Sequence, residues 1–168
     1  KNSFDLVSFD IEKNMQPDIL GDICTYDFKE EKYDYVVIVE VLEHLHSPHL
    51  AISNINSLLN QGGKIILTVP FIFPIHERPY DYYRYTKYGL EFLFKDFKNL
   101  QIKERNSWLE AINVLFVRLV MDRNFTSRAF APFFIILAYF NFPFLWILSK
   151  IIRTDFITTG YLVTALKN

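Results

Sequence analysis

Two apolar segments rich in β-branched residues, with one amphipathic segment between them, constrain the fold of this chain most. Residues 35–39 and 64–69 run without alternation of apolar and polar side chains, which is typical of strands buried on both faces of a parallel sheet. Between them, Ser47-Pro48 marks a helix start, residues 51–59 carry an apolar stripe at helical spacing, and Gly62-Gly63 marks the helix end. Strand, helix and strand in this order predict a right-handed parallel crossover and an α/β fold.

The remaining segments extend this pattern. We expect short strands at 6–9 and 18–22, a loop at 71–85, helices at 86–97 and 109–121, and strands at 100–107 and 160–166. A length of 168 residues with 51% hydrophobic residues predicts one domain over 1–168. The net charge of -1 gives no basic excess, so we expect no nucleic-acid partner. Cys24 is the single cysteine, which excludes an internal disulfide and favours a cytoplasmic location.

Acidic residues stand at the ends of three successive predicted strands, at Asp10, Asp22 and Glu40. The carboxyl ends of parallel strands meet at one edge of a sheet, where ligands bind in open α/β folds. A carboxylate there can accept hydrogen bonds from ribose hydroxyls, and a second can accept from an adenine amine. One such acid alone is usually a turn residue or helix cap, but the series of three predicts an adenosine site.

These acids belong to a longer ordered series of motifs. Its members are Asp10-Ile11-Glu12, Gly21-Asp22-Ile23, Tyr33-Asp34-Tyr35-Val36-Val37, Glu40-Val41-Leu42-Glu43-His44-Leu45, Gln61-Gly62-Gly63-Lys64 and Thr68-Val69-Pro70-Phe71. In this spacing, from about Phe4 to Phe97, the series resembles class I S-adenosylmethionine-dependent methyltransferases. The resemblance implies a three-layer, Rossmann-like, mostly parallel sheet with an antiparallel last strand, and S-adenosyl-L-methionine as the cofactor.

The same resemblance assigns cofactor-binding residues. It implies that Asp10 holds the ribose, with Ile11 beside it, and that Asp22 accepts from the adenine amine. Ile23 would offer its backbone to the adenine ring. Glu40 and Val41 would lie beside the methionine part, next to the reacting centre.

One part of the family pattern is missing. The glycine-rich loop of such folds precedes the ribose acid by roughly 20 residues, whereas nine residues precede Asp10 here and none is glycine. We therefore expect that this chain lacks the first strand and its glycine-rich loop, that the natural chain begins further upstream, and that this chain binds cofactor poorly as written.

The loop at 71–85 lies where a substrate would approach the methyl group. His76 and, after Glu40, His44 are candidates for a general base, since an imidazole titrates near neutral pH. Arg78 and Arg84 can hold a phosphate or carboxylate, and Tyr83 can stack on a sugar or aromatic ring. Structural roles compete with each of these, and Arg84 would then tie the loop to Asp81 or Glu77.

Histidines near Glu43 raise the question of a metal site. His44, His46 and His49 follow that acid closely, but none forms a His-Glu-x-x-His spacing. We therefore assign no metal site from the sequence.

Residues 129–149 contain no charged side chain, which meets the length of a membrane-spanning helix. Pro132, Asn141 and Pro143 argue against one continuous helix. We interpret 109–153 as an apolar helical insertion before the last strand. Within it, 130–152 forms two short helices that serve as a lid, a homodimer surface or a peripheral membrane contact.

The leading functional hypothesis is O-methylation of a small molecule or glycan precursor, because residues 76–85 resemble bacterial methyltransferases of surface polysaccharide or secondary metabolism. Two alternatives remain. A non-catalytic methyltransferase-fold module would dock on a membrane or partner. An NAD(P)-dependent oxidoreductase would use a Tyr-x-x-x-Lys pair, for which Tyr83 and Lys87 have the spacing.

Overall fold

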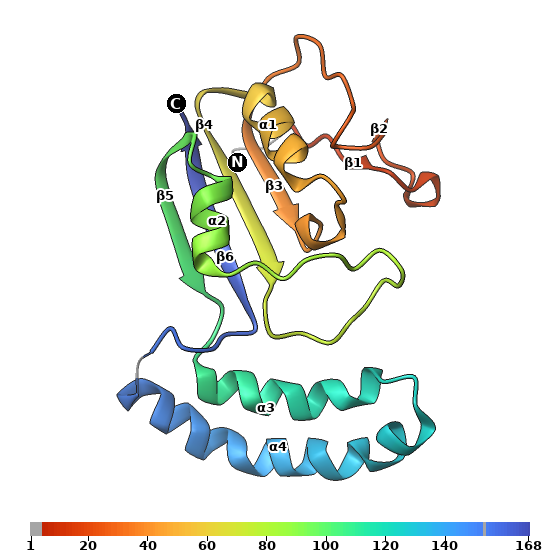
Figure 1. Cartoon of the computed structure of the whole chain (residues 1–168), viewed down its shortest axis with the longest axis vertical. Coiled ribbons are helices and arrows are strands. Elements are labelled where there is room, and N and C mark those ends of the chain that lie inside the picture. The colour runs from red at the N-terminus through yellow and green to blue at the C-terminus, as the bar shows by residue number, and fades with distance from the viewer. Residues whose placement is uncertain (1–4, 153) are drawn as a thin grey trace.

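The computed structural model describes residues 5–152 and 154–168, so Phe4 and Arg153, which bound two of the predicted regions, lie outside the described residues. A four-stranded sheet has the order β3-β4-β6-β5 (Figure 1). Its strands are β3 (Tyr33–Val39), β4 (Leu59–Pro70), β5 (Phe97–Glu104) and β6 (Gly160–Lys167). β3 runs parallel to β4, and β6 runs antiparallel to both its neighbours. The predicted parallel crossover and antiparallel last strand are therefore confirmed.

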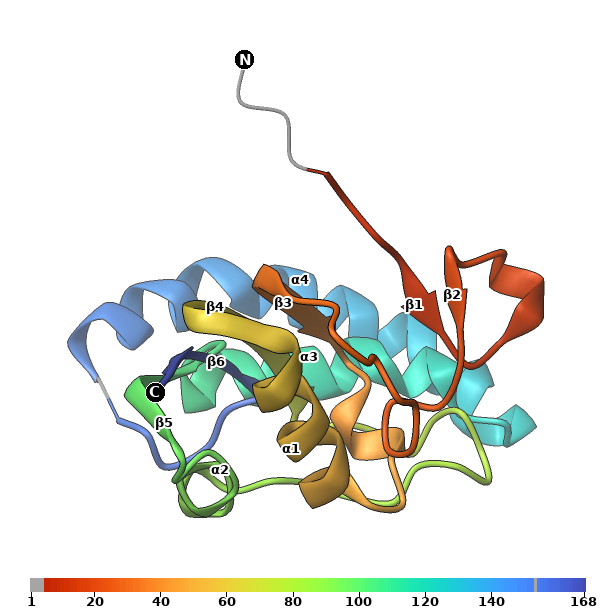
Figure 2. The same ribbon diagram turned by 90° about the horizontal axis from the view of Figure 1, so that it is seen from above.

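The first two strands form a sheet of their own. β1 (Phe9–Asp10) pairs in parallel with β2 (Ile19–Leu20), with the short 3-10 helix η1 (Lys13–Met15) between them. Figure 2 shows this pair standing apart from β3, and no described strand joins the two sheets. The predicted strand at 6–9 is shorter than expected, because Leu6, which is 88% exposed, has no neighbouring strand against which to pack.

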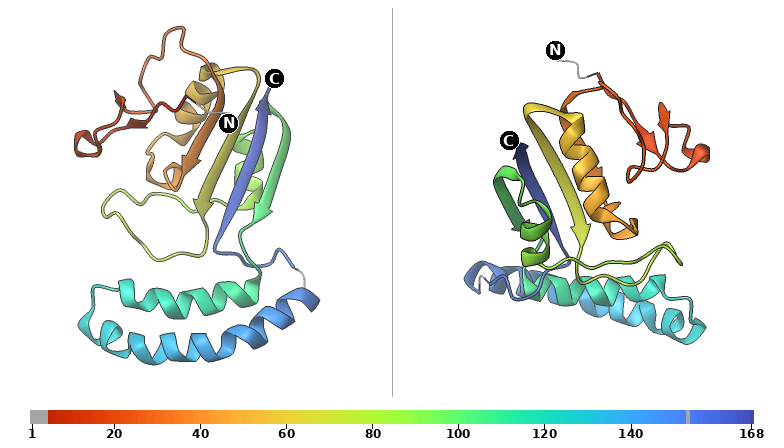
Figure 3. Two further views of the ribbon diagram at one scale, coloured as in Figure 1. Left: turned by 180° about the vertical axis from the view of Figure 1, so that it is seen from behind. Right: turned by 45° about the horizontal axis from the view of Figure 1, so that its top comes forward.

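Two helices cover one face of the larger sheet (Figure 3). α1 (Pro48–Leu58) and α2 (Lys87–Leu93) pack on the side to which β4 points Ile65, Leu67 and Val69. α1 ends before the predicted Gly62-Gly63, because Leu59 already pairs with Tyr33 as the first residue of β4. The predicted cap of α2 is confirmed, since the Thr86 hydroxyl accepts from the Gly89 backbone N–H. The core therefore lies between these helices and the sheet.

The opposite face of β3 is open in the described structure. Val37 and Val39 alternate with the inward-facing Val36 and Ile38, and they are 64% and 60% exposed. Apolar side chains of a buried parallel strand normally face a helix on each side. Within residues 5–152 and 154–168, helices α1 and α2 supply that cover on one side only.

The predicted insertion at 109–153 is a helical hairpin, but its second part differs from the prediction. α3 (Trp108–Arg118), the 3-10 helix η3 (Leu119–Met121) and α4 (Phe125–Ile151) lie beyond the end of the sheet (Figure 1). The two short helices predicted at 130–152 were wrong, since α4 is one helix that continues through Pro132 and Pro143. Contacts with α3 hold it across both prolines: the Asn113 side chain donates to the Ala138 carbonyl oxygen at 2.9 Å.

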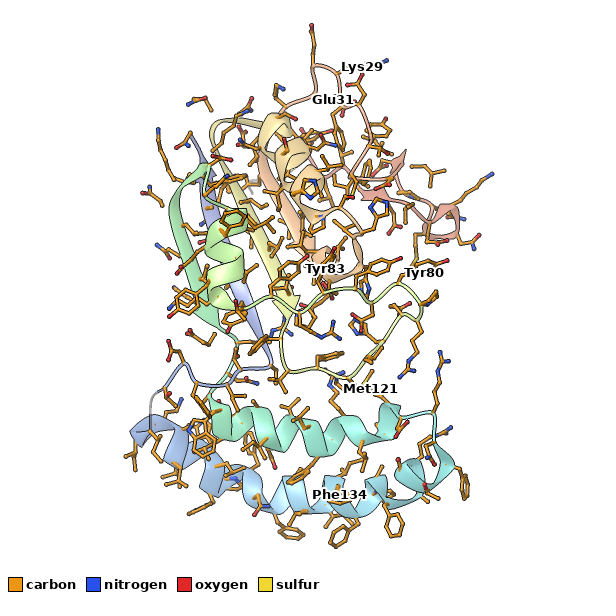
Figure 4. The ribbon with its side chains drawn as sticks, in the orientation of Figure 1. Lys29, Glu31, Tyr80, Tyr83, Met121 and Phe134 are labelled. Atoms are coloured by element: carbon orange, nitrogen blue, oxygen red, sulfur yellow. The ribbon has the colours of Figure 1, made fainter. Side chains whose placement is uncertain are left out.

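α4 is also the one described helix that is long and apolar enough to cross a membrane by length and composition. Its 27 residues have a mean hydropathy of 1.9 in the most apolar window, and 11% of that window is buried. The small residues Ala131 and Ala138 face α3 and are buried, whereas the large side chains point away. Among the large side chains, Phe134 (labelled in Figure 4) is half-buried and packs back on Phe116, with ring centroids 5.5 Å apart.

Candidate functional site

Two of the three acids predicted to share one sheet edge, Asp10 and Asp22, meet at one end of the β1–β2 pair, whereas Glu40 follows β3 in the other sheet. Phe9 lies opposite Ile19 and Asp10 opposite Leu20, and the Gly21 N–H donates to the Asp10 carbonyl oxygen at 2.9 Å. Asp10 and Asp22 thus follow parallel strands at the same edge. One oxygen of each carboxylate accepts a backbone N–H two residues further on, from Glu12 at 2.7 Å and from Cys24 at 2.8 Å. These turns fix the direction in which the carboxylates point.

Ile11 and Ile23 differ in their surroundings. Ile11 is 66% exposed beside Asp10. Ile23 packs against the main core, and its carbonyl oxygen accepts from the Asn54 side chain of α1 at 2.9 Å. The segment after β2 is therefore tied to α1, which holds the smaller sheet in place beside the larger one.

Glu40 stands at the carboxyl end of β3 in a left-handed conformation, with φ of 52°. Its backbone N–H donates to the Thr68 carbonyl oxygen at 3.1 Å, and its carboxylate accepts from the Arg105 guanidinium at 2.5 Å. Val41 follows, 40% exposed. Arg105 comes directly after β5, 65 residues away in sequence, and nothing in the sequence linked it to Glu40.

Asp81 is the centre of the loop between β4 and α2. Its carboxylate accepts two hydrogen bonds from the Arg84 guanidinium, and a third from the His76 backbone N–H at 2.9 Å. The bond from Arg84 lowers the pKa of Asp81 to about 2, so this carboxylate is charged at neutral pH. Arg84 also donates to the Pro74 carbonyl oxygen at 3.2 Å. The structure therefore contains the ion pair with Asp81 that was the structural alternative for Arg84.

The tyrosines of this loop fasten it to the 3-10 helix η2 (Leu42–His44). The backbone N–H groups of Tyr82 and Tyr83 both donate to the Glu43 carbonyl oxygen, at 3.0 and 3.2 Å. The Tyr83 hydroxyl donates to the His46 carbonyl oxygen at 3.3 Å. Figure 4 shows Tyr80 and Tyr83 on this loop above α3. Tyr83 lies outside any helix, and Arg78 is exposed, so their substrate-binding roles stay predictions.

The candidate bases His44 and His76 meet at a third residue, Glu43. Its side chain is fully buried, and neither carboxylate oxygen has a hydrogen-bond partner among the described residues. Glu43 Oε1 lies 3.6 Å from His44 Nε2 and 3.7 Å from His76 Nε2. Burial raises the pKa of the Glu43 carboxyl to about 7. A carboxylate and two imidazoles therefore converge just beyond the carboxyl ends of β3 and β4.

Comparison with known proteins identifies the family. A family described as a methyltransferase domain matches residues 1–111, about two thirds of the chain. The chain belongs to this methyltransferase family. S-adenosylmethionine is the methyl donor of such enzymes. The oxidoreductase alternative is thereby set aside. A search of curated protein sequences finds no match.

Solved structures share the fold of this methyltransferase domain. Phosphoethanolamine N-methyltransferase 2 of Haemonchus contortus, in complex with S-adenosyl-L-methionine, is 20% identical with a TM-score of 0.53, over 88% of this chain and 36% of its own. A SAM-dependent methyltransferase from Archaeoglobus fulgidus is 16% identical with a TM-score of 0.56, over 95% and 74%. The [4+2]-cyclase SpnF is 14% identical with a TM-score of 0.50, over 88% and 54%. This chain thus spans only about a third of the length of the Haemonchus protein, and the shared fold leaves the reaction open.

Two residues of this site were missed as functional residues by sequence reasoning. Glu43 appeared in a motif and beside the histidines of a metal site that was not assigned, and it was given no functional role. Asp81 appeared only as a possible tie for Arg84. Glu43 lies beside His44 and His76, and Asp81 lies beside His76. The contacts with His76 depend on the loop between β4 and α2 folding back on η2.

Replacing Asp81 by asparagine is expected to lower the free energy of unfolding by roughly 2 kcal/mol, because it leaves the half-buried Arg84 guanidinium without its carboxylate. Urea denaturation followed by circular dichroism measures this change. Glu77→Gln, in the exposed part of the same loop, is the control and should stay within about 0.5 kcal/mol of the parent. Equal stability of the two variants would show that the Asp81–Arg84 pair does not hold the loop.

Proposed function

We propose that this domain catalyses S-adenosylmethionine-dependent O-methylation of a small molecule or glycan precursor. The observation that carries the proposal is the convergence of Glu43, His44 and His76 just beyond the strand ends. The resemblance to class I methyltransferases implies that Glu40 and Val41, in the same turn, lie beside the methionine part of the cofactor. The groups that act on a proton are therefore adjacent to the place where a methyl group is delivered.

The residues present fit part of an adenosine site. Asp10 and Asp22 offer carboxylate oxygens from adjacent parallel strands, which suits ribose hydroxyls and an adenine amine. S-adenosylmethionine supplies a methyl group already activated on a sulfonium, so positioning carries much of the rate. Ile11 follows Asp10 and remains the proposed neighbour of the ribose, and Ile23 follows Asp22 and remains the proposed backbone contact of the adenine ring.

His76 is the proposed general base. Its Nδ1 lies 3.3 Å from Asp81 Oδ2 and 3.3 Å from the Pro74 carbonyl oxygen, both acceptors, so Nδ1 carries the proton and Nε2 has the lone pair. As the substrate oxygen bonds to the methyl carbon, its proton passes to Nε2 and the pair of the broken C–S bond stays on sulfur. Proton transfer of this kind contributes about 100-fold or more to a rate. Arg78 and Tyr83 are the proposed contacts for the rest of the substrate.

The test has two stages on the full-length protein. Calorimetric titration with S-adenosylhomocysteine measures cofactor binding. A panel of phenols, catechols and sugars, each incubated with S-adenosylmethionine, is then screened for formation of S-adenosylhomocysteine and a methyl ether. Cofactor binding with an accepted hydroxyl supports the proposal. No heat and no thermal shift with S-adenosylhomocysteine would favour the non-catalytic module instead.

A second proposal concerns location: the protein is cytoplasmic and α4 rests on the surface of a membrane. The outer side of α4 carries exposed aromatic and aliphatic side chains. They include Phe130, Phe133, Ile136, Phe140, Phe144 and Ile147. Exposed apolar surface on this scale indicates an interaction site.

Charge and geometry favour a lipid surface lying along the helix. Between Asp122 and Asp155 the chain has no acidic residue, whereas Arg123, Arg128 and Lys150 flank the apolar stretch, which suits anionic lipid headgroups. α3, the other arm of the hairpin, has 11 residues and is about 16 Å long, too short to cross a hydrocarbon core of about 30 Å. If α4 spanned the membrane, the short α3 could not carry the chain back across it from the polar turn at 122–124. We therefore propose that α4 lies in the plane of the interface.

Replacing Phe133 and Phe140 together by serine is expected to weaken binding to vesicles of phosphatidylethanolamine and phosphatidylglycerol at least tenfold, because each phenyl ring contributes buried apolar area. Vesicle sedimentation measures the bound fraction, and pure phosphatidylcholine vesicles should bind less. Phe92→Ser, which removes an exposed phenylalanine of α2, is the control. No vesicle binding, together with a concentration-dependent dimer that the double variant abolishes, would assign this surface to a second copy of the chain.

A further inference from the structure

We propose that Glu43, His44 and His76 bind a divalent transition-metal ion of the zinc type. The three residues each offer one ligand atom, and these atoms lie within 4.8 Å of one another. Two come from the turn after β3 and the third from the loop after β4, 32 residues later. Sequence spacing assigned no metal site near Glu43, and the fold brings His76 to it from the loop after β4.

The distances favour a shared ion over direct hydrogen bonds. A hydrogen bond between a carboxyl oxygen and an imidazole nitrogen spans about 2.6–3.2 Å, whereas Glu43 Oε1 lies 3.6 and 3.7 Å from the two Nε2 atoms. Ligand atoms around a tetrahedral zinc ion are separated by roughly 3.4 Å, since the bonds are about 2.0–2.1 Å long. The observed separations are therefore too long for a bond and near the spacing of ligands.

The second observation is the orientation of both rings. His44 Nδ1 lies 3.0 Å from the Tyr80 carbonyl oxygen, which can only accept, so this nitrogen carries a proton. His76 Nδ1 faces the Asp81 carboxylate and the Pro74 carbonyl oxygen, with the same consequence. Both neutral rings thus present an Nε2 lone pair toward Glu43. Metal-binding histidines are held in this way, with the distal N–H donated to a carboxylate or a backbone carbonyl.

Glu43 supplies the third observation. A fully buried carboxylate with no hydrogen-bond partner among the described residues is costly unless something compensates its charge. A cation between Glu43 and the two histidines compensates it. Two imidazoles and one carboxylate suit zinc, iron or cobalt better than magnesium or calcium, which prefer all-oxygen sites.

Three protein ligands leave a position open on a four-coordinate ion. Placed beyond the ends of β3 and β4, the ion would bind the substrate oxygen and stabilise its deprotonated form. It would take over from His76 the task of activating the hydroxyl. This role rests on the proposed methyl transfer, whereas metal binding itself does not.

The test is calorimetric titration of the EDTA-treated protein with zinc chloride, repeated with cobalt chloride while visible absorption is recorded. We expect one site per chain, cobalt bands typical of nitrogen and oxygen ligands, and little binding of magnesium. His76→Ala should weaken zinc binding at least tenfold. His49→Ala, which removes an exposed histidine outside the cluster, should bind zinc as the parent does.

Circular dichroism of each variant separates lost ligands from lost folding, and Glu43→Gln, which keeps the side-chain shape, provides a second ligand variant. Equal zinc binding by His76→Ala and His49→Ala, or no specific binding at all, would overturn the metal site. S-adenosylhomocysteine is titrated into the same samples. Zinc binding without S-adenosylhomocysteine binding would contradict the proposed methyl transfer but support the metal site. Binding of S-adenosylhomocysteine without zinc binding would overturn the metal site but support the proposed methyl transfer.

Discussion

Asp10→Ala is expected to weaken binding of S-adenosylhomocysteine to the full-length protein by at least 30-fold. A carboxylate that accepts from two ribose hydroxyls makes charge-assisted hydrogen bonds, each contributing about 1.5–3 kcal/mol. Losing even one such bond raises the Kd about tenfold, and losing both raises it considerably more. Isothermal titration calorimetry measures the change in Kd directly.

Asp27→Ala provides the matched control. Asp27 also accepts a backbone N–H two residues further on, from Lys29 at 2.9 Å, but it follows neither strand of the β1–β2 pair. The control therefore removes the same kind of turn at an exposed position. If Asp10→Ala and Asp27→Ala bound S-adenosylhomocysteine equally well, the adenosine site would lie elsewhere.

Glu43→Gln is expected to lower kcat for an accepted hydroxyl substrate about 100-fold or more while leaving the protein at least as stable as the parent. The amide keeps the shape of the side chain but removes the negative charge, which either orients the histidines or binds the ion. Burying an uncompensated carboxylate is unfavourable, so its neutral isostere should not destabilise the fold. Steady-state kinetics and thermal unfolding together test both halves of this expectation.

Glu91→Gln, on the exposed side of α2, is the control and should leave kcat and stability unchanged. A Glu43→Gln variant with unchanged kcat would show that the buried carboxylate has no part in catalysis. A variant with both lower kcat and a large loss of stability would instead indicate that Glu43 mainly supports the fold of η2.

The Asp10–Asp22 pair and the cluster of Glu43, His44 and His76 also differ in how they depend on the fold. Asp10 and Asp22 are placed by two short strands that pair with each other and contact the rest of the domain through Ile23 and Asn54. Glu43 and His76 are placed by the main sheet and by a loop pinned through Asp81. Substitutions at the first site should therefore affect cofactor binding alone, and those at the second should affect turnover or metal binding.

The sequence by itself determined the local elements and their order. Apolar runs rich in β-branched residues predicted β3 and β4, an apolar stripe at helical spacing predicted α1, and the last apolar run predicted β6. These predictions were possible because periodicity and propensity depend on neighbouring residues. The positions of Asp10 and Asp22 at one edge also followed, since parallel strands place their carboxyl ends together.

Only the tertiary structure decided which distant groups meet. His76 reaches Glu43 because the tyrosines of its loop hydrogen-bond to η2. Arg105 reaches Glu40 because β3 and β5, the two outer strands, run in the same direction and finish at the same end of the sheet. α4 is continuous through two prolines because α3 supports it, which no local rule for proline predicts. Periodicity and propensity depend on residues that are neighbours in sequence, whereas these contacts arise from packing between segments tens of residues apart.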